Sequence, residues 1–269
     1  MSNGSNEEWL DANRALRMDA NESIFPESRR QLHLDRYEFA AKYCTGKIVL
    51  DAACGTGYGS AILAKSAKHV TGIDIDEMTI EYARSKYGSD NTTFNVGCVE
   101  LTEIQSDSID VVVSFETVEH TLCPNSHMIE ISRVLSPSGV AVLSVPNRWG
   151  LSDHHFWDFD VRMLQRILKG RFGRVDYYYN NSSNDNNRKK GIGPLNLEEA
   201  DDAECLVAVC SDVNADHTGA HGYQSVLHEI YDGVFERHQE FLRLQSELKS
   251  DAHGFTRSIK KMIKRVIAR

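Results

Sequence analysis

Short apolar segments alternate with longer amphipathic ones through residues 47–145. Five runs of apolar and β-branched residues predict buried strands at 47–53, 69–74, 92–97, 109–115 and 139–145. Helical spacing follows or separates them at 58–66, 77–87 and 125–135, and Pro137 and Gly139 predict a turn before the last strand. Because the strands are apolar throughout and helices lie between them, the pattern predicts a doubly wound α/β fold with a mostly parallel sheet covered on both faces.

The segments on either side of this core are less regular. Residues 1–45 predict an N-terminal arm followed by a helix over 29–43. Within a core of residues 46–212, a helix near 160–169 and strands at 173–179 and 204–210 are expected, with a mobile, Asn-rich and Gly-rich insert near 180–202. Residues 213–269 predict a helical C-terminal extension that ends in a basic amphipathic helix.

Composition places the chain among ordinary globular proteins. It has 269 residues, of which 41% are hydrophobic and 26% charged, so it can bury a core without disulfides. The six cysteines lack a paired CxxC spacing, and reduced, mostly buried thiols are expected. The longest apolar runs are well below the roughly 18 residues that span a bilayer, and the first residues are polar. A cytoplasmic location is therefore expected.

Charge bears on the partners. The formal net charge of −9 would repel a nucleic-acid backbone, so a nucleic-acid partner is not expected. From Phe255 onward, however, the chain carries basic residues and no acid. This tail could make peripheral contact with the inner face of an anionic membrane, pack on an acidic surface of the chain or of a second subunit in a homodimer, or remain solvated. The sequence leaves these alternatives open.

A glycine-rich turn follows the first predicted strand, in the sequence LDAACGTGYG of residues 50–59. Gly55 and Gly57 would let a nucleotide approach the backbone at the carboxyl edge of the sheet. Asp51 would repel a pyrophosphate there, but it suits a ligand that carries an ammonium and a sulfonium group. Asp74 ends the second strand and could accept hydrogen bonds from both ribose hydroxyls. The alternative for Asp74 is a helix cap, a role that Asp76 or Thr79 could serve equally.

The segments VLDAACGTGYG, GIDID, VVVSFETVEH and LSPSGVAVLSVPN resemble the successive motifs of class I S-adenosylmethionine-dependent methyltransferases. The resemblance covers roughly residues 30–180. It implies a Rossmann-like sheet of seven strands, with 204–210 as a reversed final strand, and S-adenosyl-L-methionine as the cofactor. It also implies cofactor contacts from Tyr37, Asp51, Ala53, Gly55, Gly57, Asp74, Ile75, Cys98, Val99, Phe115 and Glu116. The family commonly has an Asp for the adenine amino group where this chain has Cys98, so the adenine is expected on backbone groups of Cys98 and Val99.

The candidate catalytic residues are His120, His155 and Glu119. His120 follows the fourth strand, and imidazole titrates near neutrality, so His120 could remove a proton from an oxygen acceptor. It could equally support the pocket. The string E-x-x-E-H of residues 116–120 resembles that of quinone-precursor and small-RNA O-methyltransferases, some of which use a metal. A divalent cation on Glu116, Glu119 and His120 is therefore an alternative, although no metal is assigned.

Two further segments resemble bacterial methyltransferases of surface-glycan synthesis. The HLDRY stretch of residues 33–37 implies a lid helix over the cofactor, and a loop with Asp153, His154, His155 and Trp157 suits a hydroxylated acceptor. An ordinary surface loop with a buried Trp157 is the alternative. The expected reaction is O-methylation of a sugar hydroxyl on a small-molecule, nucleotide-linked or lipid-linked glycan acceptor. The alternatives are N-methylation of an amino sugar, metal-assisted methylation of a diol or catechol, and a non-catalytic cofactor-binding subunit.

Overall fold

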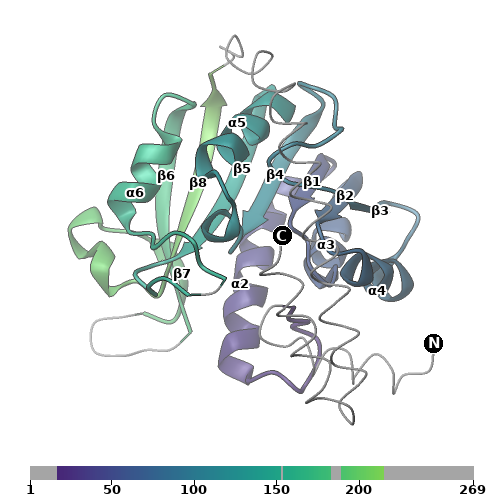
Figure 1. Cartoon of the computed structure of the whole chain (residues 1–269), viewed down its shortest axis with the longest axis horizontal. Helices are drawn as coiled ribbons and strands as arrows, with labels where there is room; N and C mark the ends of the chain where they lie inside the picture. The colour runs from purple at the N-terminus through teal and green to yellow at the C-terminus, as the bar shows by residue number, and fades with distance from the viewer. Residues whose placement is uncertain (1–16, 153, 183–188, 215–269) are drawn as a thin grey trace, which may run out of the picture. The chain divides into compact units, whose positions relative to one another are not determined.

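The computed structural model describes residues 17–152, 154–182 and 189–214, in which a central sheet lies between two layers of helices (Figure 1). The strand order is β3-β2-β1-β4-β5-β8-β6-β7. The strands are β1 Ile48–Ala52, β2 His69–Asp74, β3 Thr92–Val96, β4 Ile109–Phe115, β5 Leu135–Pro146, β6 Phe172–Asn181, β7 Gly191–Pro194 and β8 Cys205–Val213. The predicted α/β fold with a mostly parallel sheet is confirmed.

Strand direction follows from the way the strands are connected. Strands β1 to β5 pair in parallel because a helix or a long loop returns the chain to the same edge each time. Strand β8 is the reversed strand that the sequence predicts, and it runs antiparallel to both β5 and β6. All carboxyl ends of β1 to β5 therefore meet at one edge of the sheet, where a crevice forms in folds of this type.

The helices have recognisable start signals. They are α2 Glu27–Cys44, α3 Tyr58–Ala64, α4 Glu77–Tyr87, α5 Pro124–Val134 and α6 Val161–Leu168, with 3-10 turns η1 Val118–His120 and η2 Leu197–Asp202. Asp76 caps α4 by accepting the amide hydrogen of Met78 at 3.0 Å, and Asp160 caps α6 in the same way through Met163 at 2.8 Å. Helices α5 and α6 cover one apolar face of the sheet, and α2 and α3 cover the other.

Three parts of the architecture differ from the prediction. The sheet has eight strands rather than seven, because β7 pairs with β6 inside the segment expected to be a mobile insert. Its sequence, Gly-Ile-Gly-Pro, has little strand propensity, so pattern alone could not find it. Pro137 and Gly139 do not form a separate turn but lie within β5, beside a shift in its register with β4. Residues 17–25, expected to belong to a loose arm or a short helix, instead form turns that bury Met18, Ala20 and Phe25.

Several expectations lie outside the described residues. They are the arm at 1–16, Asp153, the middle of the insert at 183–188, and the C-terminal extension from 215 onward with its basic helix. The chain divides into two units, Met1–Gln224 and Ser225–Arg269, and every described residue belongs to the first. Among the described residues, no helix combines the length and the apolar character needed to cross a membrane.

Candidate functional site

The glycine-rich turn joins β1 to α3 and requires unusual backbone angles. Ala53, Gly55 and Gly57 have positive φ values of 62°, 53° and 85°. Two independent reasons exclude a side chain at Gly57. A Cβ atom would lie 2.7 Å from the Cβ of Ala83, and the left-handed backbone disfavours any L residue. The turn therefore presents bare backbone at the carboxyl edge of the sheet.

Asp74 lies beside this turn at the end of β2. Its Oδ2 accepts the Gly55 amide hydrogen at 3.0 Å, and its Oδ1 accepts that of Asp76 at 3.0 Å. Because Asp76 is the residue that caps α4, the helix-cap alternative for Asp74 is not needed. A carboxylate has about four acceptor positions, so two remain on Asp74 for the hydroxyls of a ligand.

Asp51 is completely buried at the end of β1. Its Oδ1 accepts a hydrogen bond from the Tyr37 hydroxyl at 3.2 Å, and its Oδ2 accepts one from Ser60 Oγ at 2.6 Å. Burial raises the pKa of Asp51 to about 7, although both hydrogen bonds oppose the shift. The Tyr37 ring packs edge-on against Phe115, with centroids 5.1 Å apart, so Tyr37 contacts both Asp51 and Phe115.

The pKa of Asp51 gives a stability prediction for the cofactor-free chain. An acid whose pKa is raised by folding stabilises the folded state at low pH, and this contribution is lost as the pH rises toward about 7. Asp51→Asn removes the titrating group, so only the wild type loses this stability as the pH rises. The free energy of unfolding of the variant, minus that of the wild type, should therefore rise by about 2 kcal/mol between about pH 5 and about pH 8. Urea unfolding at both pH values measures the difference; a constant difference contradicts the prediction.

The predicted adenine contacts lie after β3. Cys98 and Val99 are half-buried in a turn closed by a backbone bridge between Cys98 and Leu101, and Ile75 is half-buried next to Asp74. The Val99 carbonyl lies 3.0 Å from Nδ1 of the buried His127 on α5. Sequence reasoning missed His127, since a single buried histidine in an amphipathic helix carries no motif signal.

Arg36 is a second residue that sequence reasoning did not select. It lies on α2, is only 1% exposed, and its Nη1 is 3.2 Å from Oε1 of Glu116. Burial lowers the pKa of Arg36, but attraction to Glu116 raises it above its ordinary value, so the guanidinium stays charged. Within the described part of the chain, none of its three guanidinium nitrogens makes a hydrogen bond. Apart from the ion pair of Nη1 with Glu116, these buried N–H groups have no acceptor among the described residues, which fits a site that a ligand completes.

Glu116 follows β4 with a positive φ of 49°, and Ser144 on β5 donates a hydrogen bond to its Oε1 at 2.9 Å. The thiol of Cys205 on β8 also faces its carboxylate, at 4.0 Å. The buried Arg36 and the half-buried Glu116 thus form a pair of opposite charges, close to the end of β4. Such a pair matches the two charges of an amino-acid group.

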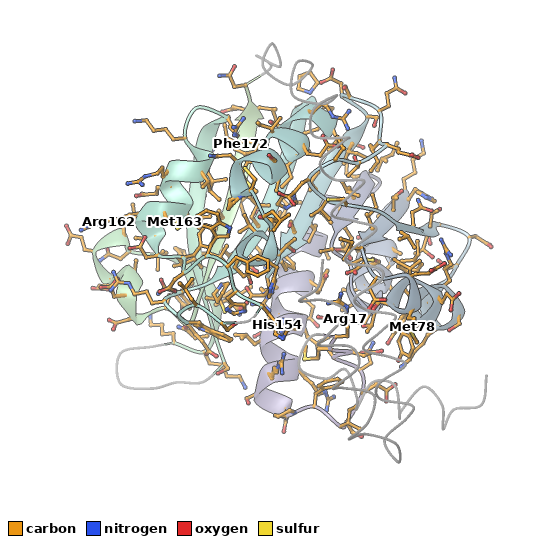
Figure 2. The ribbon with its side chains drawn as sticks, viewed as in Figure 1. Arg17, Met78, His154, Arg162, Met163 and Phe172 are labelled. Carbon is orange, nitrogen blue, oxygen red and sulfur yellow. The ribbon has the colours of Figure 1, made fainter. Side chains whose placement is uncertain are left out.

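The three predicted catalytic residues come together at the end of β4. One ligand atom from each of Glu119, His120 and His155 lies within 4.8 Å of the others. The His120 and His155 rings are 4.9 Å apart between centroids, and His120 also contacts the carbonyl of His154, which Figure 2 labels. The sequence suggested Glu116, Glu119 and His120 as the alternative cation site, but Glu116 is not in this cluster. His155, which is 35 positions along the chain from His120, takes its place.

Two residues of the cluster, Glu119 and His120, have pKa values shifted from the ordinary values of their side chains. Glu119 is fully buried, and both of its carboxylate oxygens lack a hydrogen-bond partner among the described residues. Burial, and then repulsion by Glu116, raise the pKa of Glu119 well above its ordinary value. Partial desolvation lowers the pKa of His120, whose side chain is 39% exposed, so this imidazole is neutral near pH 7. A neutral imidazole can accept a proton.

Exposed aromatic and aliphatic side chains surround the cluster on the loop after β5. Trp149 is 54% exposed, Phe156 50% and Trp157 37%, and the Trp149 ring lies 6.5 Å from that of His155. The indole Nε1 of Trp157 donates a hydrogen bond to the Thr121 carbonyl at 2.9 Å, while the side chain stays exposed. The alternative of a buried Trp157 is therefore wrong.

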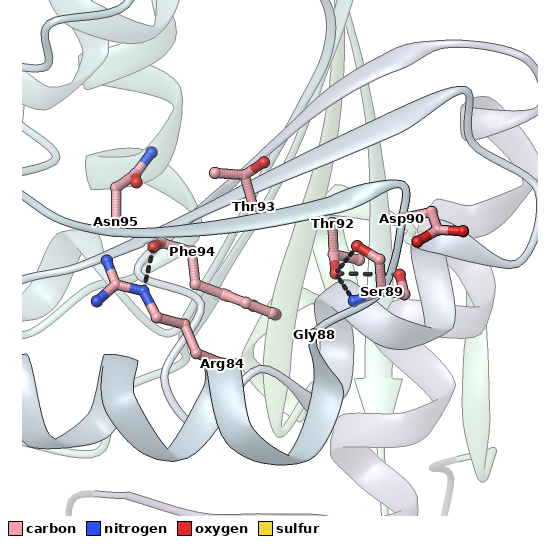
Figure 3. A pocket seen from close by; sticks show the side chains of 8 residues that line it. All are labelled: Arg84, Gly88, Ser89, Asp90, Thr92, Thr93, Phe94 and Asn95. Carbon is pink, nitrogen blue, oxygen red and sulfur yellow. Dashed lines mark hydrogen bonds between the residues drawn. The ribbon is translucent and has the colours of Figure 1, made fainter.

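An open hollow of about 610 Å³ lies elsewhere, between the edge strand β3 and the end of α4 (Figure 3). It is lined by Arg84, Gly88, Ser89, Asp90, Thr92, Thr93, Phe94 and Asn95. Arg84 Nε donates to the Phe94 carbonyl at 2.8 Å and so covers part of the free edge of the sheet. None of the predicted site residues lines this hollow.

Part of the chain is similar in sequence to known methyltransferases. Residues 50–143 match the family model described as a methyltransferase domain. A probable S-adenosylmethionine-dependent methyltransferase of Mycolicibacterium smegmatis is 38% identical over 112 residues, which cover 42% of this chain and 43% of that protein. A ubiquinone biosynthesis O-methyltransferase of Actinobacillus pleuropneumoniae is 33% identical over 125 residues, which cover 44% and 53%. The chain thus spans about half the length of these relatives.

The fold agrees with a solved structure. The N-methyltransferase NodS of Bradyrhizobium japonicum, in complex with S-adenosylhomocysteine, superposes with a TM-score of 0.53 over 68% of this chain and 87% of that one, at 16% identity. The free acceptor positions of Asp74, the bare backbone at Gly57 and the unpartnered N–H groups of Arg36 fit the ribose and the amino-acid end of S-adenosylmethionine. Residues 50–143 are accordingly similar to a methyltransferase domain, and the sheet that contains them has a Rossmann-like fold.

Proposed function

We propose that the chain transfers the methyl group of S-adenosylmethionine to a hydroxyl oxygen of a small, polyhydroxylated acceptor, with a sugar as the preferred class. The observation that carries this proposal is the cluster of Glu119, His120 and His155 at the end of β4. An oxygen acceptor must lose a proton during methyl transfer, and the cluster supplies a neutral imidazole for it. The name of one relative, an O-methyltransferase, also favours an oxygen acceptor.

The residues of the chain divide the work between binding and proton removal. When bound, the cofactor supplies a methyl group on a cationic sulfur. Asp74 holds the ribose, and Arg36 and Glu116 hold the carboxylate and ammonium of the amino-acid end. His120 removes the hydroxyl proton at its Nε2, and most of the rate advantage comes from holding the two reactants in line.

The surroundings of the cluster favour a sugar acceptor. Aromatic faces stack on sugar rings; the exposed Trp149 ring lies 6.5 Å from that of His155, and the exposed Phe156 and Trp157 follow His155 in the same loop. A sugar also presents neighbouring hydroxyls that His120 and His155 can bind together. A catechol would offer a similar pair of hydroxyls, so the acceptor has to be identified by experiment.

The second candidate is metal-assisted O-methylation. A carboxylate and two imidazoles within 4.8 Å of one another are a common ligand set for Mn²⁺, Co²⁺ or Zn²⁺. The unpartnered oxygens of the buried Glu119 favour this candidate, since a cation would compensate them. The cation would bind a diol of the acceptor and lower the pKa of the attacking hydroxyl.

Chelation separates the two candidates. With His120 as the base, prolonged treatment with EDTA should leave the turnover number within about twofold of its starting value, because no step needs a cation. The measurement is the rate of S-adenosylhomocysteine formation before and after treatment. A loss of activity that added Mn²⁺ or Mg²⁺ restores would favour the metal-assisted reaction, and Glu119→Gln would then abolish the restoration.

A screen of acceptors tests the proposal itself. Sugar nucleotides, lipid-linked glycans, amino sugars and catechols are incubated with the chain and the cofactor, and S-adenosylhomocysteine is measured. We expect turnover with a hydroxylated sugar, and mass spectrometry should place the new methyl group on oxygen. Turnover with amino sugars alone would replace the proposal by N-methylation. Cofactor binding with no turnover on any acceptor would favour a non-catalytic subunit.

A further inference from the structure

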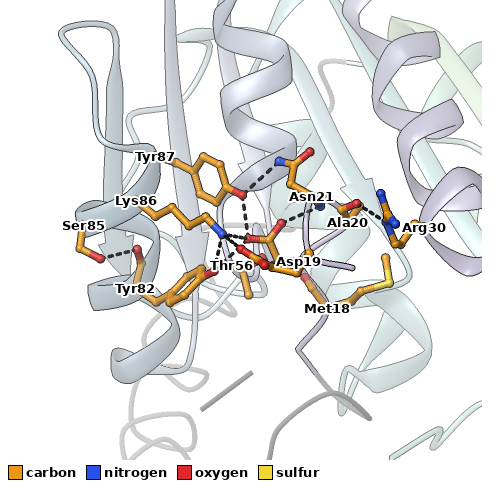
Figure 4. Close-up of polar contacts among 11 residues, drawn as sticks. Met18, Asp19, Ala20, Asn21, Arg30, Thr56, Tyr82, Ser85, Lys86 and Tyr87 are labelled. Carbon is orange, nitrogen blue, oxygen red and sulfur yellow. Dashed lines mark hydrogen bonds and ion pairs between the residues drawn. The ribbon is translucent and has the colours of Figure 1, made fainter. Parts of the chain in front are cut away.

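Residues 17–25, here called the N-terminal strap, lie against the cofactor site. The Thr56 hydroxyl, within the glycine-rich turn, donates a hydrogen bond to the Met18 carbonyl at 2.8 Å, and both residues are buried (Figure 4). From α2, Arg30 Nε donates to the Ala20 carbonyl at 2.8 Å. The strap is therefore bonded on one side to the turn that faces the cofactor and on the other to the predicted lid helix.

Asp19 fastens the strap to α4. It is completely buried, and its Oδ2 accepts hydrogen bonds from the hydroxyls of Tyr82 at 3.0 Å and Tyr87 at 2.7 Å and from Lys86 Nζ at 3.1 Å. Its Oδ1 accepts the Asn21 amide hydrogen at 2.9 Å. A buried carboxylate with four donors fixes its backbone closely, because each donor would lose its partner if the carboxylate moved.

This anchor places Arg17, two residues earlier, at the ribose-binding carboxylate (Figure 2 labels Arg17). Arg17 Nη2 lies 3.6 Å from Oδ1 of Asp74, and Arg17 Nε lies 3.5 Å from Oδ2 of Asp76 and 3.1 Å from Thr79 Oγ1. The side chain is 20% exposed, whereas that of Asp74 is 6% exposed. The guanidinium thus closes the outer side of Asp74 and holds its carboxylate in one orientation.

We propose that Arg17 and Asp19 are positioning residues for the cofactor. Asp19 anchors the strap to α4, and the strap holds Arg17 beside Asp74, where it keeps the carboxylate turned toward the ribose hydroxyls. The inference rests on the cofactor assignment of the proposed function, but it does not depend on the acceptor. It assigns a binding role to a segment that shows no periodic pattern in the sequence.

The test is calorimetric binding of S-adenosylhomocysteine by the full chain. Arg17→Met keeps the length of the side chain and removes its charge, and it should weaken binding about tenfold. Thr56→Val removes the hydrogen bond to Met18 and should weaken binding in the same direction. Arg84→Met is the matched control: it removes an arginine beside the hollow of Figure 3, away from Asp74, and should leave the affinity unchanged.

A second ligand distinguishes positioning from a general loss of structure. Because Arg17 acts through Asp74 on the ribose, Arg17→Met should weaken the binding of the 2′-deoxy analogue of S-adenosylhomocysteine by only about threefold or less. For S-adenosylhomocysteine itself, the losses of affinity caused by Arg17→Met and Asp74→Asn should not add. Asp19→Asn should reproduce this dependence on the ribose hydroxyl. Wild-type affinity in Arg17→Met and Thr56→Val, or equal losses with both ligands, would overturn the inference while leaving the proposed function intact. Absence of binding by the wild-type chain would overturn both.

Discussion

His120→Ala should lower the turnover number by about 10²- to 10⁴-fold, while the affinity for S-adenosylhomocysteine stays within about twofold of wild type. The physical reason is that His120 is the neutral imidazole of the Glu119, His120 and His155 cluster, and without it the acceptor hydroxyl keeps its proton during attack. Steady-state rates with saturating acceptor measure the loss, and calorimetry measures the affinity.

The pH profile tests the same role. A base must be unprotonated, so the wild-type rate should rise with pH through the pKa of His120, which burial holds below its ordinary value of 6.5. This rise at acidic pH, the acidic limb of the pH profile, should be absent from the residual activity of His120→Ala. The matched control is His69→Ala, since His69 begins β2 at the opposite edge of the sheet. A loss of tenfold or less with an unchanged limb would make His120 a supporting residue rather than the base.

Arg36→Met should weaken the binding of S-adenosylhomocysteine by about 10²-fold or more, because a buried guanidinium contributes about 1.5–3 kcal/mol for each hydrogen bond to a charged group. The three N–H-bearing nitrogens of Arg36 have no hydrogen-bond partner among the described residues, and the carboxylate of the ligand would supply two. Methylthioadenosine lacks this carboxylate, so its affinity should change little. Calorimetry with both ligands measures the contrast.

Two further variants control for folding. Arg36→Met leaves Glu116 as a charge without its partner, so Arg36→Met combined with Glu116→Gln separates the loss of a ligand contact from the cost of an unpaired charge. Arg29→Met removes an exposed arginine of the same helix and should bind both ligands like wild type. Equal losses for S-adenosylhomocysteine and methylthioadenosine would show that Arg36 does not contact the amino-acid end.

The sequence predicts the part of this fold in which local pattern and tertiary position agree. Strands β2 and β4 and helix α4 have the bounds expected from apolar runs and helical spacing, and Asp51 and Asp74 lie where strand ends place them. The sequence does not predict the strap, because the strap consists of turns and lacks periodic spacing of apolar residues. Its buried Asp19 is held by partners on α4 that are more than 60 positions away. Such contacts leave no trace in a window of neighbouring residues.

The candidate site shows the same division. His120 and Glu119 are neighbours in one motif and could be named from it, but only the folded chain brings His155 to them. Arg36 violates the expectation that arginine lies at the surface, because its charge is compensated by Glu116, which is distant in the sequence and follows β4. The number of strands was one too low since β7 is stabilised by pairing with β6 rather than by its own residues.

The carboxyl group of Asp51 has a consequence for how the site distinguishes substrate from product. With its pKa at about 7, it is partly protonated in the empty site, so arrival of a cation at this position should expel a proton into the buffer. S-adenosylmethionine carries a sulfonium charge and S-adenosylhomocysteine does not. Mild acidification should therefore weaken the binding of S-adenosylmethionine more than that of S-adenosylhomocysteine. The product should then compete more strongly with S-adenosylmethionine for the site.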